Sequence, residues 1–342
     1  MSIEIKNQIA SIQEFVLTSK TGMQLRVLNY GATISSLKVP LQNRSLVEVV
    51  LGFNSPGDYV NSFEFGHAPY FGAVVGRFAG RIRNAEFELN GRIIQLDKNL
   101  GDHHLHGGTQ GFSNKIWSVS SQTVGDEPSI TFAITSPHMD QNYPGELKVE
   151  VRYRLTLKGE LVIHYQATSS EDTLVNLTQH SYFNLDGHQG DVTHQELKIK
   201  ADKVLETDEE NVPTGQRISL ENHPCNFSKF KPVPSQIDDA FVLDFENDLA
   251  AELKSKKNDL HMKVYTNQPC LQVYVGGKID SKLTSKGQIN YHKTSGICFE
   301  TQAFPDAPNL DDFPSAILKK DDVYQQHTKF QFMNLSSEHT KN

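Results

Sequence analysis

The chain has 342 residues, of which 33 are lysine or arginine and 41 are aspartate or glutamate, so its formal net charge is −8. This mild negative charge argues against a nucleic acid partner, and three cysteines are too few for a disulfide scaffold. No run of about 18 apolar residues occurs, so we expect no membrane-spanning segment. Residues 1–15 are charged and lack the apolar segment of a secretion signal. Composition therefore predicts a globular protein of a reducing compartment, with the cytoplasm as the expected location.

Apolar residues mostly alternate with polar ones along the chain, which is typical of β-strands with one buried face. The dipeptide Asn90-Gly91 favours a tight turn and predicts a hairpin over residues 86–96. A longer antiparallel hairpin is predicted from residues 147–157 and 161–167, which alternate on both sides of a lysine-glycine turn.

The second half of the chain continues this pattern. Residues 208–215 are polar and predict a surface loop, and the alternation returns at residues 262–264 and 271–275. Helix-period segments are scarce, and neither G-x-G-x-x-G nor a Walker loop occurs, which argues against a nucleotide cofactor. No linker is evident, so we expect one all-β domain with its strands stacked as a sandwich.

Four polar islands interrupt the alternation, and the first, residues 76–83, reads GRFAGRIR. Arginine forks bind planar acceptors and paired hydroxyls well, so these three arginines are candidates for a binding site. A solvated strand end is the structural alternative for this segment.

The second island, residues 102–108, reads DHHLHGG. On a strand, His104 and His106 would lie on one face and His103 on the other, so the three rings would not converge on one metal ion. The chain also has no H-E-x-x-H motif and no cysteine pair at zinc spacing. We therefore expect no metal, and instead a hydrogen-bonding histidine beside a glycine pair, where a ligand can approach the backbone.

The third and fourth islands, residues 176–185 and 299–309, read NLTQHSYFNL and FETQAFPDAPN. His180 can donate or accept a proton near neutral pH, and a buried histidine with a satisfied hydrogen bond is the structural alternative. Glu300 ends an apolar run, so desolvation is expected to raise its pKa towards that of a general base. A charge that protects a sheet edge is the alternative for Glu300.

Together and in this order, these segments resemble the aldose 1-epimerase (galactose mutarotase) family almost from end to end. The most specific motifs are LHGG, NLT-x-HSYFNL and ETQ-x-x-PDA. Further matches are LNYGA at residues 28–32, VLGF at residues 50–53 and QPCLQVY at residues 268–274. The resemblance implies a large antiparallel β-sandwich, the galactose mutarotase-like supersandwich, in one domain over residues 1–342.

The family's reaction interconverts the α and β anomers of a free aldose such as galactose or glucose. The resemblance therefore implies a free aldohexose as small-molecule partner, no cofactor and no metal, in a monomer or a homodimer. Matched position by position, His180 corresponds to the proton donor and Glu300 to the proton acceptor. The substrate-binding positions fall on Gly80, Arg81, His106, Ser181, Tyr182, Asp238 and Gln272.

Two motifs depart from the family pattern. The arginine motif usually reads A-N-R-I, and Gly80 replaces its asparagine, so one side-chain contact is missing. The aspartate motif commonly reads G-x-D-H, and Gln236 and Asp239 stand at its glycine and histidine positions. Asp238 remains the family match, although Asp239 adjoins it.

Two further expectations concern the surroundings of the acid and the base. A charged Glu300 close to His180 would help to keep that histidine protonated. Cys270 and Cys298 each lie two residues before a site residue, so on a strand each would share its face.

Two other functions fit the same scaffold. A hexose-6-phosphate epimerase would need a cationic phosphate pocket, which only the GRFAGRIR segment could supply. A non-catalytic sugar-binding protein would be expected to lose the acid or the base, and both are present.

Overall fold

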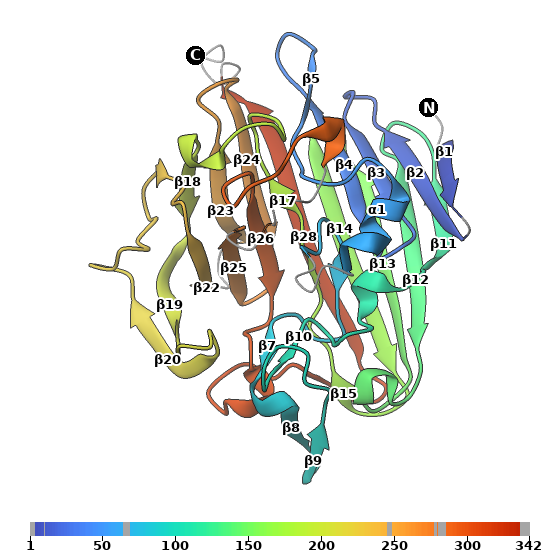
Figure 1. Ribbon diagram of the computed structural model, residues 1–342, viewed down its shortest axis with the longest axis vertical. Helices are drawn as coiled ribbons and strands as arrows, with labels where there is room; N and C mark the ends of the chain where they lie inside the picture. Colours follow the sequence, from blue (N-terminus) through green and yellow to red (C-terminus); the bar gives the residue numbers. More distant parts are fainter. Residues whose placement is uncertain are drawn as a thin grey trace.

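Antiparallel strands make up most of the computed structural model, which describes residues 4–9, 11–63, 69–244, 248–276, 279 and 285–335 (Figure 1). In this part of the chain, the one α-helix is α1 (Pro56–Ser62), which begins with a capping box between Ser55 and Asp58. No helix among the described residues is both long and apolar enough to cross a membrane.

The largest sheet has nine strands. In spatial order they are β11 (Ser118–Thr123), β12 (Ser129–Ser136), β13 (Leu147–Leu155), β14 (Glu160–Ser169), β28 (Val323–Asn334), β24 (Leu260–Thr266), β23 (Leu249–Lys254), β18 (Glu196–Ile199) and β21 (Lys231–Pro232). β13 alternates strictly between buried and exposed residues and pairs with β14, which confirms the predicted long hairpin. The strand ends at Leu155 rather than at residue 157, because Leu157 lies exposed in the turn.

Two smaller sheets pack against this one. The five-stranded sheet contains β1 (Glu4–Ile9), β2 (Ile12–Thr18), β3 (Gln24–Leu28), β4 (Ile34–Pro40) and β5 (Leu46–Glu48). The six-stranded sheet contains β17 (Tyr182–Phe183), β26 (Ile297–Gln302), β25 (Cys270–Val275), β22 (Ile237–Leu243), β19 (Ala201–Thr207) and β20 (Pro213–Ser219). Phe15 of β2 meets Phe132 of β12 at a ring distance of 5.8 Å, and Phe183 of β17 meets Phe330 of β28 at 4.7 Å. These contacts belong to one buried apolar cluster, which confirms the predicted sandwich.

Four short strand pairs lie outside these three sheets in the described part of the chain. They are β6 (Val74–Val75) with β16 (Thr178–Gln179), β7 (Arg81–Ile82) with β10 (His104–Leu105), β8 (Glu86–Leu89) with β9 (Arg92–Gln95), and β15 (Thr173–Leu174) with β27 (Ile317–Leu318). Single-turn 3₁₀ helices are η2 (Arg83–Ala85), η3 (Phe112–Asn114), η4 (Asp140–Asn142), η5 (Val192–His194), η6 (Lys286–Gln288) and η7 (Ala307–Asn309).

The other local predictions can now be compared with the strands. The β8–β9 hairpin is confirmed, and the alternation at residues 262–264 and 271–275 corresponds to β24 and β25. The predicted loop over residues 208–215 is shorter than expected, because β20 begins at Pro213.

Candidate active site

A pocket of about 170 Å³ lies where the six-stranded sheet meets the β7–β10 pair. All the predicted site residues except Ser181 line it: Gly80, Arg81, His106, His180, Tyr182, Asp238, Gln272 and Glu300. Ser181 is buried outside the pocket lining, where its hydroxyl accepts a hydrogen bond from Gln179 Nε2 at 2.7 Å. The fold therefore gathers residues from distant parts of the chain into one cavity and leaves Ser181 as a neighbour of the site.

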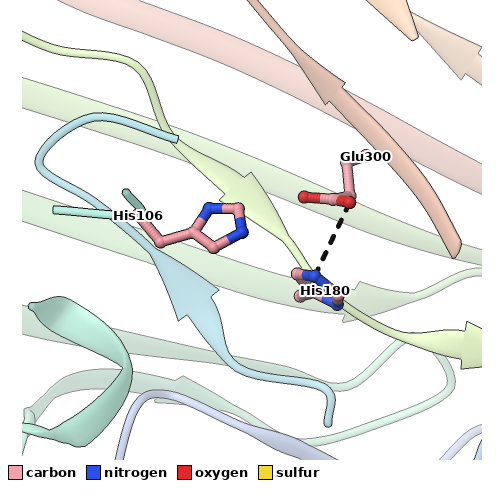
Figure 2. A group of neighbouring side chains, drawn as sticks. All are labelled: His106, His180 and Glu300. Atoms are coloured by element: carbon pink, nitrogen blue, oxygen red, sulfur yellow. Dashed lines mark ion pairs between the residues drawn. The ribbon is translucent and has the colours of Figure 1, made fainter. Parts of the chain in front are cut away.

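His180 and Glu300 face each other in this pocket (Figure 2). Tyr182 of β17 pairs with Cys298 of β26 in antiparallel register, so the residue two positions before Tyr182 comes close to the residue two positions after Cys298. His180 Nε2 lies 3.6 Å from Glu300 Oε1, and the two residues are only 4% and 3% exposed. The antiparallel register thus brings the predicted acid and base within reach of one small substrate.

Burial decides the protonation of this pair. It raises the pKa of Glu300 to about 8, with a smaller contribution from the negative charge of Asp238, while Arg81 opposes the shift. Burial also lowers the pKa of His180 to about 4. The predicted rise for Glu300 is confirmed, but the expectation that its charge keeps His180 protonated is wrong, because burial lowers the pKa of that histidine. Burial thus disfavours the charged form of both groups, so that at neutral pH the pair holds one proton.

The His180 ring is held by aromatic and sulfur contacts. Tyr70 stacks on it at a ring distance of 5.8 Å and an angle of 28°, and Tyr182 lies at 5.2 Å and 32°. The Cys298 sulfur lies 3.6 Å from His180 Nδ1, and burial keeps the pKa of this thiol well above its usual value. Cys298 therefore faces the site, as its spacing from Glu300 predicted. The opposite ring nitrogen, Nε2, is the one turned to the carboxyl group.

His106 follows β10 and lies in the left-handed region, with φ of 52°. The backbone N–H of Gly80 donates to His106 Nδ1 at 3.2 Å, and the backbone N–H of His106 donates to the Gly80 carbonyl at 3.1 Å. Because Nδ1 accepts a hydrogen bond, the neutral ring carries its hydrogen on Nε2. Figure 2 shows this ring directed towards His180 and Glu300, so His106 can act as a hydrogen-bond donor in the pocket.

A second polar group adjoins the acid–base pair. Gln272 lies opposite Glu300 in the β25–β26 pair, and its Nε2 donates to Asp238 Oδ1 at 2.7 Å. Arg81 Nη2 lies 4.0 Å from Asp238 Oδ2. Asp239 contacts Cys225 instead, with the Cys225 Sγ 3.4 Å from Asp239 Oδ2, and does not line the pocket. The structure thus brings Asp238, and not its neighbour, into the site.

Comparison with known proteins decides the family. Residues 13–331 match the sequence profile of the family described as Aldose 1-epimerase. This chain belongs to the aldose 1-epimerase family. The chain is 36% identical over 333 residues to galactose mutarotase of Bos taurus, with 94% of each chain covered. It is 33% identical over 334 residues to aldose 1-epimerase of Escherichia coli strain K12, with 93% of this chain and 94% of the relative covered. A crystal structure of an aldose epimerase homologue from C. elegans superposes with a TM-score of 0.87 at 27% identity, covering 94% of this chain and 98% of the other.

His106, His180 and Glu300 also form a cluster in which one potential ligand atom of each lies within 4.8 Å of the others. A metal ion would need an unprotonated ring nitrogen from each histidine. In His106, Nδ1 faces the Gly80 amide hydrogen, and Nε2 therefore carries the hydrogen of the ring. This arrangement fits a hydrogen-bonding role in an aldose 1-epimerase and does not fit a metal ligand.

The other two histidines of the DHHLHGG segment have structural contacts. His104 is buried between the Asp97 carbonyl and the Tyr143 hydroxyl, at 2.8 Å from each. His103 accepts a hydrogen bond from the backbone N–H of Asn84 and contacts Glu210. The expectation that His104 and His106 share one face is wrong, because the strand ends at Leu105 and the positive φ of His106 turns its ring away.

The three arginines of the GRFAGRIR segment have separate roles. Arg77 is 2% exposed, and its guanidinium donates to Ser136 and to the carbonyls of residues 136, 137, 144 and 145. Arg81 lines the pocket. Arg83 pairs with Asp208 at 2.8 Å, and its backbone N–H donates to Asp306 at 2.9 Å. The solvated strand end is therefore wrong for Arg77, which is part of the core.

Sequence reasoning missed other residues that line the pocket, among them Tyr70 and Gln302. Gln302 could have been found, since it lies two residues after Glu300 on β26 and so shares its face. Tyr70 lies in a loop, where no periodicity indicates which way a side chain turns.

Proposed function

We propose that His180 and Glu300 are the acid–base pair with which this protein opens and closes the ring of a free aldose. Membership of the aldose 1-epimerase family makes it an isomerase that interconverts the α and β anomers of aldoses. The observation that carries the assignment of the pair is the 3.6 Å separation of His180 Nε2 and Glu300 Oε1 in a pocket where burial leaves one proton between them at neutral pH.

Ring opening requires a base for the anomeric hydroxyl and an acid for the ring oxygen. With the shared proton on His180, Glu300 accepts the hydroxyl proton as the C1=O double bond forms. The C1–O5 bond breaks, its electron pair goes to O5, and His180 protonates that oxygen. The pair again holds one proton, now on Glu300, which is the distribution that burial of the two groups favours.

Closure on the other face of the aldehyde uses this second distribution. Rotation about C1–C2 presents the other face, Glu300 returns its proton to the carbonyl oxygen, and His180 takes the proton from O5–H as C1–O5 reforms. Acid–base assistance of this kind contributes roughly 10²- to 10⁴-fold in rate. The reaction transfers no electrons and no chemical group away from the sugar, so it needs no co-reactant.

The remaining pocket residues suit a polyhydroxylated ring. Arg81 and His106 present N–H donors, and the Asp238 carboxylate accepts hydrogen bonds from hydroxyl groups. Tyr182 adds an aromatic surface for the apolar face of a pyranose. These contacts support a free aldohexose such as galactose or glucose as substrate.

A hexose 6-phosphate is less well supported. A phosphate site would draw on the GRFAGRIR segment, yet Arg77 is bound to buried oxygen acceptors and Arg83 is paired with Asp208. Polarimetry on freshly dissolved α-glucose and α-glucose 6-phosphate tests this, and a faster catalysed rate on the phosphate would overturn the assignment. Polarimetry also separates an enzyme from a non-catalytic sugar-binding protein, which would leave the spontaneous rate unchanged.

We also propose that residues 1–342 form one domain, because the pocket draws on residues from Gly80 to Glu300. A cytoplasmic location agrees with the cysteines Cys225, Cys270 and Cys298, which are all free thiols. We keep the expectation of a monomer or a homodimer with no nucleic acid partner.

A further inference from the structure

Gln302 is a polar residue of the pocket that has no part in the mechanism above. Gln302 lies at the end of β26, two residues beyond Glu300 and on the same face of the strand. It is 1% exposed, and among the residues that the structure describes its Oε1 has no hydrogen-bond partner. Buried amide oxygens are normally paired, because an unpaired one loses its hydration without compensation. Gln302 therefore lines the pocket with an amide whose oxygen is not satisfied by any residue that the structure describes.

Gly80 lies directly beside this amide. A Cβ atom on residue 80 would lie 3.5 Å from Gln302 Nε2 and 3.2 Å from Pro305 Cβ. The family motif usually has an asparagine at this position. The side-chain amide of such an asparagine would lie against the amide of Gln302. Because residue 80 is glycine here, the space next to the Gln302 amide is left to the ligand.

We propose that Gln302 is a further substrate-binding residue, whose side-chain amide forms a hydrogen bond with a sugar hydroxyl in the part of the pocket beside Gly80, where its Nε2 lies. The inference rests on the proposed function, because it places the sugar in the pocket of His180 and Glu300. Two residues along a strand span about 6.6 Å, so a hydroxyl at Gln302 is remote from the anomeric group at Glu300. Its hydrogen bond is the same in the closed ring and in the transition state, and it therefore acts on KM rather than on kcat.

The test compares wild type with Gln302→Leu, which keeps the approximate size of the side chain and removes the amide. We expect KM for galactose to rise about 10- to 100-fold, with kcat within about threefold of wild type. Gln326→Leu is the matched control, because Gln326 is equally buried but hydrogen-bonded to Tyr324 and Thr301 outside the pocket. That control should lower the melting temperature and leave KM unchanged.

A panel of monodeoxy galactoses identifies the hydroxyl that Gln302 binds. With wild type, the analogue that lacks this hydroxyl should show a raised KM, and with Gln302→Leu it should show no further rise, as in a double-mutant cycle. If every analogue loses affinity to the same extent in both proteins, or if KM is unchanged in Gln302→Leu, the inference is wrong. Should Gln302→Leu fail to fold, Gln302→Asn withdraws the amide by one methylene and is expected to raise KM in the same direction.

The experiments distinguish a failure of the proposed function from a failure of the role proposed for Gln302. A wild-type protein without mutarotase activity would overturn the proposed function. An active wild type whose KM does not depend on Gln302 would overturn only this inference.

Discussion

Glu300 Oε1 lies 3.6 Å from His180 Nε2, and both side chains are almost completely buried. The register of β17 with β26 fixes this approach, since Tyr182 and Cys298 pair two residues away from each of them. The pair is therefore built into the sheet and does not depend on a substrate to bring it together. The predictions on activity follow from how this pair holds its single proton.

Replacing the base should separate catalysis from binding. We expect Glu300→Gln to lower kcat by about 10²- to 10⁴-fold, because the amide cannot accept the anomeric proton, while sugar still binds through Arg81 and Asp238. Polarimetry on fresh α-galactose gives the rate, and calorimetry gives the affinity. Glu209→Gln, at an exposed glutamate, is the control. A near-normal rate in Glu300→Gln would remove the base assignment.

The pH dependence of kcat/KM should reflect the joint titration of His180 and Glu300. Below a pH of about 4 both groups are protonated and no base is left, and above about 8 neither is protonated and no acid is left. We therefore expect kcat/KM to be highest between these limits, to fall with decreasing pH near 4 and to fall with increasing pH near 8. Polarimetry across this range, in buffers that do not catalyse mutarotation, measures both limbs. A single limb near pH 6.5 would instead indicate an ordinary, solvated histidine.

Loss of the acid should be severe as well. We expect His180→Asn to lower kcat by about 10²-fold or more, since asparagine cannot donate a proton to the ring oxygen. His194→Asn, at an exposed histidine, should retain the wild-type rate. An unchanged rate in His180→Asn would move the acid role to His106, because His104 is held by Asp97 and Tyr143.

Arg77 provides a test of stability rather than of activity. Its guanidinium donates hydrogen bonds to five oxygen atoms, and a lysine ammonium has only three hydrogens to offer. We expect Arg77→Lys to lower the free energy of unfolding by about 2–4 kcal/mol, since at least two acceptors lose their partners. Denaturant unfolding measures the change. The exposed Arg92→Lys is the control and should change stability by less than about 0.5 kcal/mol.

Local sequence patterns predicted where the strands lie in the chain better than which strands pair with each other. Alternation and a turn dipeptide were sufficient for the β13–β14 and β8–β9 hairpins, because each pairs adjacent segments. The sequence could not indicate that β28 inserts between β14 and β24, since that pairing joins distant segments. Alternation also failed at His106, where a positive φ reverses the direction of the side chain.

The sequence predicted which residues form the site, but it did not predict their protonation. Family motifs located His180, Glu300 and Asp238, but the protonation of the pair was predicted with the wrong sign for His180. Proximity of a carboxylate alone raises the pKa of a histidine, and only the structure reveals that burial of both groups outweighs this attraction.

The position of β28 has a consequence for how the protein is made. It is the last of the described strands along the chain, yet it pairs with β14 on one side and with β24 on the other. Until residues 323–334 have left the ribosome, the central sheet therefore exists as two separate halves, each with an unpaired inner edge. The sheet can be completed only after residues 323–334 have been synthesised, and a nascent chain that stalls before this point exposes two edges that other chains can join.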